Sequence, residues 1–127
     1  MDIIEIKSNK NNLMKGALLL KPQIYFDDRG YFFESWNNRT LNELLSREIN
    51  FVQDNHSKSR LGVLRGLHYQ ITPKPQAKLV RCTKGSIYDV IVDLRINSSS
   101  FGEWYGVYLN DENKLQLWVP EGFAHGF

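Results

Sequence analysis

KLVRCTKGSIYDVIVDLRI (residues 78–96) contains the pattern that decides the fold class. In its second arm every second residue from Tyr88 to Leu94 is apolar, so these side chains share one face of an extended strand. The other face carries Ile87, Asp89, Ile91 and Asp93. Lys84-Gly85 between the two arms predicts the bend of a hairpin.

The flanking segments continue the pattern of short extended runs. GALLLKPQIYFDDRGYFFESW (residues 16–36) predicts two runs joined by a turn at residues 27–30. TLNELLSRE (residues 40–48) has Thr40 three residues before Glu43, a capping box that predicts a short helix. SSSFGEWYGVYLN (residues 98–110) and KLQLWVPEGFAHGF (residues 114–127) predict two more strands. Many short strands with one short helix indicate an all-β sandwich or barrel.

Length and composition exclude several classes of protein. A chain of 127 residues is long enough for a single domain, residues 1–127, with a core of its own. A net charge of +2 gives no reason to expect nucleic acid or a membrane surface as partner. Cys82 is the only cysteine, and neither a signal peptide nor a membrane-spanning run is present. We therefore expect a soluble domain located in the cytoplasm.

Two spacings point beyond the fold class. The segment GVLRGLHYQITPKPQAKLVRCTKG (residues 62–85) has a regular set of spacings. Five residues separate Gly62 from His68, one separates His68 from Gln70, seven separate Gln70 from Lys78, and six separate Lys78 from Gly85. If residues 65–70 form a strand, His68 and Gln70 share a face. PEGFAHGF (residues 120–127) places a proline, a glycine and a histidine, His125, at spacings of one and two residues.

These spacings resemble the two motifs of the cupin superfamily, which implies a small jelly-roll β-barrel. Metal-binding cupins have a second histidine where this chain has Gln70 and a glutamate where it has Lys78. An amide is a poor ligand and an ammonium is no ligand, so we expect the barrel without its metal.

Successive blocks of the chain also resemble the dTDP-4-dehydrorhamnose 3,5-epimerase family. The blocks are FDDRGYFFESW, FVQDNHSKS, GVLRGLHYQ, KLVRCTKGSIYDVIVDLR, FGEWYGV and LWVPEGFAHGF. The resemblance implies an isomerase that inverts C3 and C5 of a thymidine-diphosphate-linked 4-keto-6-deoxyhexose on the route to dTDP-rhamnose and bacterial surface polysaccharides such as the O-antigen of lipopolysaccharide. It implies a homodimer and no cofactor.

The resemblance also implies roles for individual residues. A hydrogen next to a ketone is weakly acidic, so the reaction needs a positioned base and a group that stabilises the enolate oxygen. The family pattern assigns the base to His68 and the enolate contact to Lys78. It assigns nucleotide-sugar binding to Arg29, Glu34, Gln53, Asp54, Asn55, His56, Arg65, Lys78 and His125. Asp89 lies on the strand face opposite the apolar stripe and is predicted to orient an imidazole.

Simpler interpretations exist for several of these residues. Arg29 follows two aspartates and is also suited to a surface ion pair. His56 lies among polar neighbours and is equally consistent with a plain loop. The role of Asp89 in orienting an imidazole is predicted only from the strand face on which it lies.

Two classes of function stay open at this level. One is the epimerase, which we expect to require a longer chain, because in the family a tyrosine acid and an aspartate paired with the base follow the position of Phe127. We therefore expect this chain to be a fragment. The other is a non-catalytic cupin that binds sugar nucleotides. A related epimerase acting on another nucleotide sugar, or on a single carbon, would share the same blocks.

Overall fold

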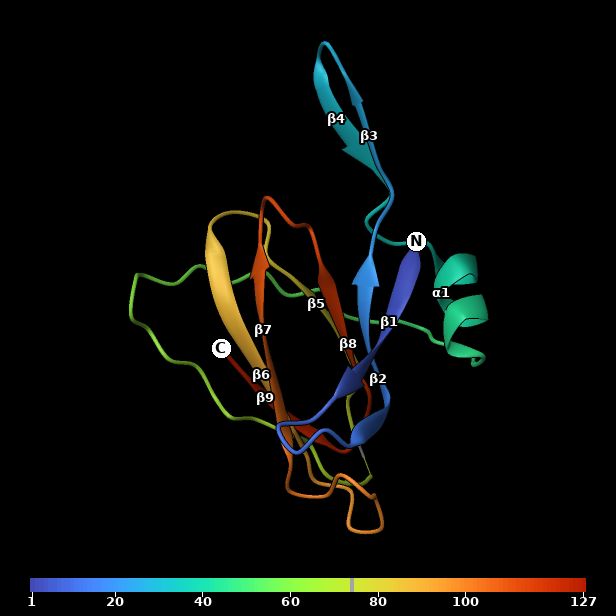
Figure 1. Cartoon of the computed structure of the whole chain (residues 1–127), viewed down its shortest axis with the longest axis vertical. Coiled ribbons are helices and arrows are strands. Elements are labelled where there is room, and N and C mark those ends of the chain that lie inside the picture. The colour runs from blue at the N-terminus through green and yellow to red at the C-terminus, as the bar shows by residue number, and fades with distance from the viewer. Residues whose placement is uncertain (74) are drawn as a thin grey trace. The chain divides into compact units, whose positions relative to one another are not determined.

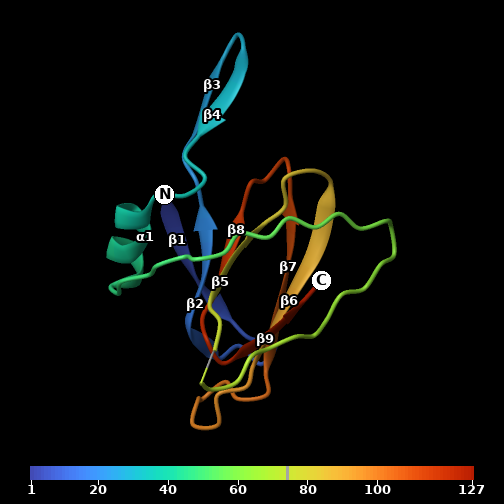
Figure 2. The same cartoon turned by 180° about the vertical axis from the view of Figure 1, so that it is seen from behind.

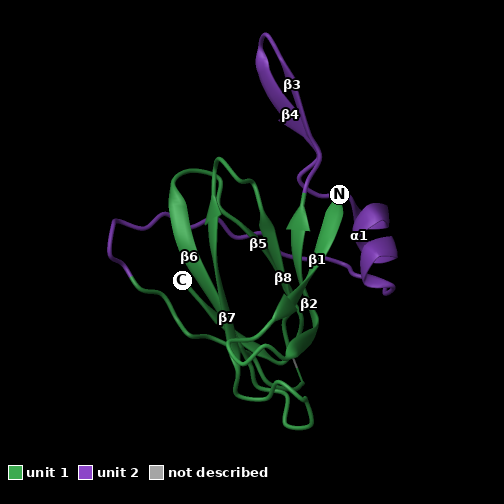
Figure 3. Cartoon of the chain, viewed as in Figure 1, with its two compact units in different colours: residues 1–21, 64–127 green, residues 22–63 purple. Residues whose placement is uncertain are grey.

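The computed structural model describes residues 1–73 and 75–127, and they form two compact units (Figure 3). The first unit comprises residues 1–21 and 64–127, and the second comprises residues 22–63. Apart from one short helix, the regular structure in the described residues is all β-strand, which confirms the predicted fold class. No helix among them is long and apolar enough to cross a membrane.

The first unit consists of two antiparallel sheets (Figures 1 and 2). The four-stranded sheet has the order β1-β2-β8-β5, and the three-stranded sheet has the order β7-β6-β9. The bounds are Asp2–Lys7 for β1, Leu13–Lys21 for β2, Lys78–Arg81 for β5, Ser86–Asp93 for β6, Trp104–Asn110 for β7, Gln116–Val119 for β8 and Phe123–Gly126 for β9.

The core of this unit lies between the inner faces of the two sheets. Met14, Leu117 and Val119 of the larger sheet belong to one buried cluster with Ile91 and Leu109 of the smaller sheet. Leu117 and Val119 alternate along β8, so their side chains share the face that packs into this cluster.

The segment that suggested a hairpin instead crosses between the two sheets. β5 pairs with β8 and β6 pairs with β7 and β9, so the arms on either side of Lys84-Gly85 are not partners and the hairpin prediction is wrong. The bend is held from outside: Gly85 N–H donates to the Asp111 carboxylate (3.1 Å), and Asp111 N–H donates to Gly85 O (3.1 Å). Each arm gains more apolar contact in a separate sheet than a flat ribbon of two strands would give.

The last predicted run is also divided. Residues 114–127 form β8 in the larger sheet and β9 in the smaller one, separated by the turn at residues 120–122. This turn places His125 in the same sheet as β6, which matters for the site.

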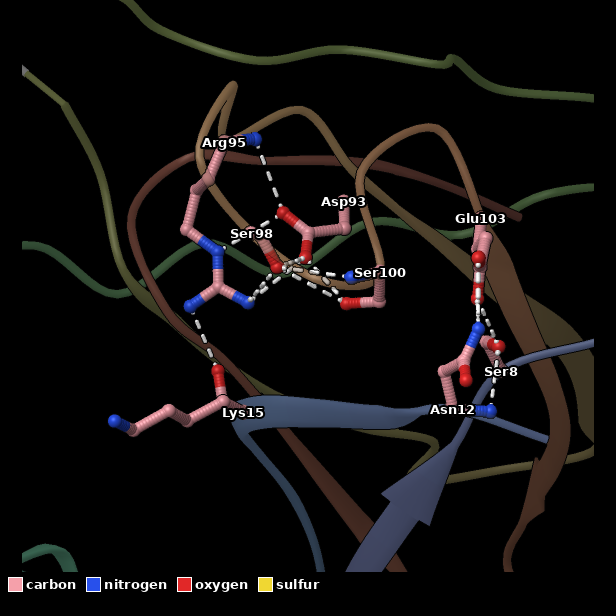
Figure 4. Close-up of polar contacts among 8 residues, drawn as sticks. All are labelled: Ser8, Asn12, Lys15, Asp93, Arg95, Ser98, Ser100 and Glu103. Carbon is pink, nitrogen blue, oxygen red and sulfur yellow. Dashed lines mark hydrogen bonds and ion pairs between the residues drawn. The ribbon is translucent and has the colours of Figure 1, made fainter. Parts of the chain in front are cut away.

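Buried polar networks fix the loops at one end of the first unit (Figure 4). Asp93 accepts hydrogen bonds from the backbone and guanidinium of Arg95 and from the hydroxyls of Ser98 and Ser100. Burial alone would raise the pKa of Asp93, but these hydrogen bonds hold its pKa well below its usual range. Arg95 also donates to Lys15 O (2.7 Å), which ties the loop to β2.

The second unit contains the hairpin of β3 (Ile24–Asp27) and β4 (Gly30–Phe33), followed by α1 (Asn38–Leu45). The turn at residues 27–30 was predicted, and the register of the pair confirms it. The capping box was not correct. Asn37 is the N-cap, its side chain accepts from Thr40 N–H (3.2 Å), and Thr40 lies inside the first turn. Asparagine is as good an N-cap as threonine or better, so the helix begins earlier.

Candidate active site

His68 is held against β9 by backbone hydrogen bonds. His68 N–H donates to His125 O (2.8 Å) and His125 N–H donates to His68 O (2.9 Å). Arg65 and Phe127 exchange a second pair, at 2.6 and 2.9 Å. Residues 65–70 were predicted as a strand, but the structure forms only an isolated bridge at His68, and Gln70 lies outside any strand.

Two glycines make this close approach possible, and one of them, Gly66, also interrupts the strand. A Cβ on Gly126 would lie 2.7 Å from the carbonyl oxygen of Arg65, and a Cβ on Gly66 would lie 2.8 Å from Gly126 Cα. Gly66 has φ of +105°, a conformation that side-chain-bearing residues rarely adopt. A regular strand therefore cannot continue through Gly66.

The pairing brings two of the predicted histidines together. Residues directly opposite each other in an antiparallel pair project to the same face. His68 is opposite His125, and His125 is opposite Ile91 of β6, so all three share the inner face of the sheet. The His68 side chain is exposed and the His125 side chain is buried.

Asp89 occupies the same inner face, one pleat away from Ile91. It is completely buried, and its Oδ1 lies 2.7 Å from Nε2 of His125. This is the distance of an ion pair, but the ring N–H is not aligned with the carboxylate as a hydrogen bond requires. The imidazole that Asp89 contacts is thus that of His125. In the sequence, the only indication of this contact was that Asp89 and Asp93 fall on the strand face that also carries Ile87 and Ile91.

Lys78 begins β5 in the opposite sheet and is half-buried. Its burial lowers its pKa, and the negative charge of Asp89 partly counteracts this by raising it. Asp89 thus contacts His125 directly, and its charge acts on the pKa of Lys78. No group of three histidine, cysteine or carboxylate side chains suited to a metal ion occurs within residues 1–73 and 75–127.

The other predicted binding residues have exposed side chains. Arg65 is in the first unit, beside β9. In the second unit Arg29 lies in the β3–β4 turn and forms an ion pair with Asp27 (2.6 Å), as its simpler interpretation anticipated. Glu34 accepts from Asn37 (3.1 Å), and Gln53 donates to Asn55 (3.0 Å). Asp54 and His56 lie in the same exposed segment as Gln53 and Asn55.

A family model described as dTDP-4-dehydrorhamnose 3,5-epimerase matches residues 11–127. The chain belongs to the dTDP-4-dehydrorhamnose 3,5-epimerase family. The enzyme of that name from Salmonella typhimurium is 58% identical over 111 residues, which make up 87% of this chain and 61% of the relative. The chain thus spans about three fifths of the length of this curated relative.

Solved structures of the epimerase family agree with this fold. An epimerase from Legionella pneumophila, in complex with dTDP-4-keto-L-rhamnose, has a TM-score of 0.87 and 46% identity, covering 99% of this chain and 64% of its own. ChmJ of Streptomyces bikiniensis, a 3'-monoepimerase in complex with dTDP-quinovose, has a TM-score of 0.83 and 33% identity, covering 88% and 57%. The predicted cupin-type jelly roll is confirmed by this agreement.

Proposed function

We propose that this protein epimerises C3 and C5 of dTDP-4-dehydro-6-deoxy-D-glucose to give dTDP-4-dehydro-L-rhamnose, for surface polysaccharide synthesis. Family membership supports the reaction class. The observation that carries the proposal is the pairing of His68 with His125 on a sheet face that also holds Asp89. The pairing fixes the backbone of His68, whose imidazole is exposed, next to His125, which contacts the buried Asp89 carboxylate.

The chemistry needs a base and an enolate stabiliser, and the first unit supplies both. In this proposal neutral His68 takes the proton from the carbon next to the ketone, since an imidazole is a suitable base near neutral pH. The electron pair moves into the ketone, and the Lys78 ammonium stabilises the resulting enolate oxygen. The general acid that the family resemblance implies, a tyrosine after the position of Phe127, then gives a proton to the opposite face of the same carbon and inverts it. His68 releases its proton to solvent, and the sequence repeats at the second carbon.

The diphosphate requires fixed positive charge, and we assign Arg65 and Arg29 to it because a guanidinium pairs well with phosphate oxygens. We also assign the polar residues Glu34, Gln53, Asp54, Asn55 and His56 of the second unit, and His125 of the first, to binding of the nucleotide sugar. The Arg29–Asp27 ion pair is highly exposed and contributes little free energy, so Arg29 can exchange Asp27 for a phosphate at little cost in free energy.

A homodimer is part of the proposal. The β3–β4 hairpin exposes Tyr25, Phe26, Tyr31 and Phe32 at 56–75% of their surface. A two-stranded hairpin is marginally stable alone, and exposed aromatic clusters commonly mark interfaces. A second copy of the chain would cover these rings. We also propose a cytoplasmic location, which suits a chain with a single cysteine.

Incubation of the full-length protein, the longer chain expected from the sequence, with the dTDP-4-keto sugar in heavy water tests the reaction. We expect deuterium at both C3 and C5 by NMR and formation of the L-sugar. Exchange at C3 alone would identify a single-carbon epimerase. Saturable binding of the nucleotide sugar with no exchange at either carbon would contradict the proposed activity and identify a binding protein.

A further inference from the structure

Strand β9 is short, and its own side chains specify its register only weakly. It consists of Phe123–Gly126, and Phe123 is its only large apolar side chain. The opposite face of the strand carries Ala124 and Gly126, which offer little or no side chain for packing. A shift of one residue against β6 would turn His125 to the other face of the sheet. The register of β9 therefore depends on contacts made by residues outside the strand.

Arg95 supplies such contacts at the start of β9. Its guanidinium carbon lies 4.6 Å from the centre of the Phe123 ring, which is a cation–π contact. Its aliphatic stem packs on Gly122, where a Cβ would lie 2.6 Å from Arg95 Cγ. The neighbouring Leu94 N–H donates to Gly122 O (3.0 Å). Because Phe123 and His125 are two residues apart in a strand, fixing the Phe123 ring also fixes the face to which His125 projects.

The guanidinium of Arg95 is itself held from both sheets (Figure 4). Its Nε and Nη2 donate to the two carboxylate oxygens of the buried Asp93, each at 2.9 Å, in a bidentate ion pair. Its Nη1 donates to Lys15 O in β2 (2.7 Å). Asp93 is also the residue of β6 that lies opposite Phe123. The side chain that contacts the start of β9 thus has a fixed position of its own.

The position of β9 in turn decides where His68 lies. His68 exchanges two backbone hydrogen bonds with His125, and Arg65 exchanges two with Phe127. His68 forms an isolated bridge and belongs to no regular strand, so the placement of its backbone follows that of β9.

We propose that Arg95 is a positioning residue for the reaction: held by Asp93, it fixes the turn into β9 and thereby places His125 and His68. This inference rests on the proposed function, in which His68 is the base. Arg95 acts through β9 and not by contact with the substrate.

The test compares Arg95→Met with Ser8→Ala in the full-length protein. Methionine keeps an unbranched apolar stem over Gly122 but has no guanidinium. Ser8→Ala is the matched control, because it removes a buried hydrogen bond to Glu103 at the same end of the unit (Figure 4). The hydrogen-bond partners of the Ser8 hydroxyl, Glu103, Lys10 and Asn12, all lie outside β9. Amide hydrogen exchange is followed by NMR, and kcat is measured in parallel.

We expect a local effect in Arg95→Met. The amides of His68 and His125 should exchange faster, relative to those of residues 18–20 in β2, by at least about tenfold, which corresponds to about 1.4 kcal/mol. The value of kcat should fall by about 10²-fold for a displacement of about 1 Å. In Ser8→Ala all of these amides should change together, with kcat near that of wild type. Unchanged relative protection of His68 and His125 in Arg95→Met, or an equal loss of kcat in both variants, overturns the inference.

Arg95→Lys is the second variant and covers the case in which Arg95→Met does not fold. It keeps a positive charge beside the buried Asp93 but lacks the planar fork that bonds Asp93 and Lys15 O together. Amide exchange of His68 and kcat should both lie between those of wild type and Arg95→Met, and wild-type values of both overturn the inference. If wild type shows no deuterium exchange into the substrate but the His68 amide still responds to Arg95→Lys, the positioning role stands and the proposed function is wrong.

Discussion

Replacing Gly126 with alanine tests whether the backbone bridge to β9 is what holds His68 in place. The new Cβ would lie 2.7 Å from the Arg65 carbonyl oxygen and 3.1 Å from a methyl carbon of Leu67. Real Cβ atoms essentially never approach a backbone oxygen so closely, so residues 65–68 must move away from β9. The movement breaks at least the two hydrogen bonds between Arg65 and Phe127.

The magnitude follows from these bonds. Two backbone hydrogen bonds contribute about 1–3 kcal/mol in total. Replacing glycine by alanine at an unstrained φ returns about 0.4–1 kcal/mol by restricting the unfolded chain. We therefore expect the free energy of unfolding to fall by about 1–2 kcal/mol. Because a 1 Å displacement of a reacting group can cost about 10²-fold in rate, exchange should fall much more than stability alone explains.

Gly102→Ala provides the control. Gly102 has φ of +77° and nothing within 4 Å of a new Cβ, so alanine there adds backbone strain of about 1–2 kcal/mol without touching residues 65–68. Urea unfolding should give similar losses for the two variants, and deuterium exchange should fall only in Gly126→Ala. Wild-type exchange in Gly126→Ala would refute the claim that the bridge positions His68.

Three further predictions concern ligand, metal and assembly. Arg29→Ala and Arg65→Ala should each weaken binding of thymidine diphosphate by about 1.5–3 kcal/mol in calorimetry, the range for a hydrogen bond to a charged group, and unchanged affinity in both would remove them from the phosphate site. Elemental analysis of protein purified without added metal should find no stoichiometric iron, zinc or manganese, because Gln70 and Lys78 stand at ligand positions of the metal cupins; one metal per chain would contradict this. Light scattering at micromolar concentration should give a dimer, and a monomer would count against a partner covering the β3–β4 hairpin.

Alternation along the strands was sufficient to predict the fold class, because burial of one face imposes a period of two on the sequence. It did not identify the buried face of β6: Asp89, Ile91 and Asp93 are fully buried, whereas Tyr88 in the apolar stripe is exposed. Strand pairing was not predictable, since nothing local to Lys84-Gly85 distinguishes a hairpin from a crossing between sheets. The capping error has the same origin: Asn37 and Thr40 are both good caps, and the helix that begins after Asn37 buries Leu41.

Motif spacing and strand alternation predicted candidate residues for the site but not the contacts among them. The motif spacing singled out His68, Lys78 and His125, and strand alternation singled out Asp89. Which imidazole Asp89 approaches depends on the register of β6 with β9, and register is set by packing across the whole sheet. The regular strand predicted for residues 65–70 failed at Gly66, where φ is positive.

The central claim is that His68 is the base, and His68→Asn in the full-length protein tests it most directly. Asparagine keeps the backbone hydrogen bonds to His125 and a polar side chain but cannot take the proton near neutral pH. The NMR signals of the sugar ring protons are followed in heavy water, with thymidine diphosphate affinity as the check on folding. We predict exchange at both C3 and C5 slowed by about 10²–10⁴-fold with affinity unchanged. Exchange at the wild-type rate at both carbons would contradict the account and leave His68 with a structural role.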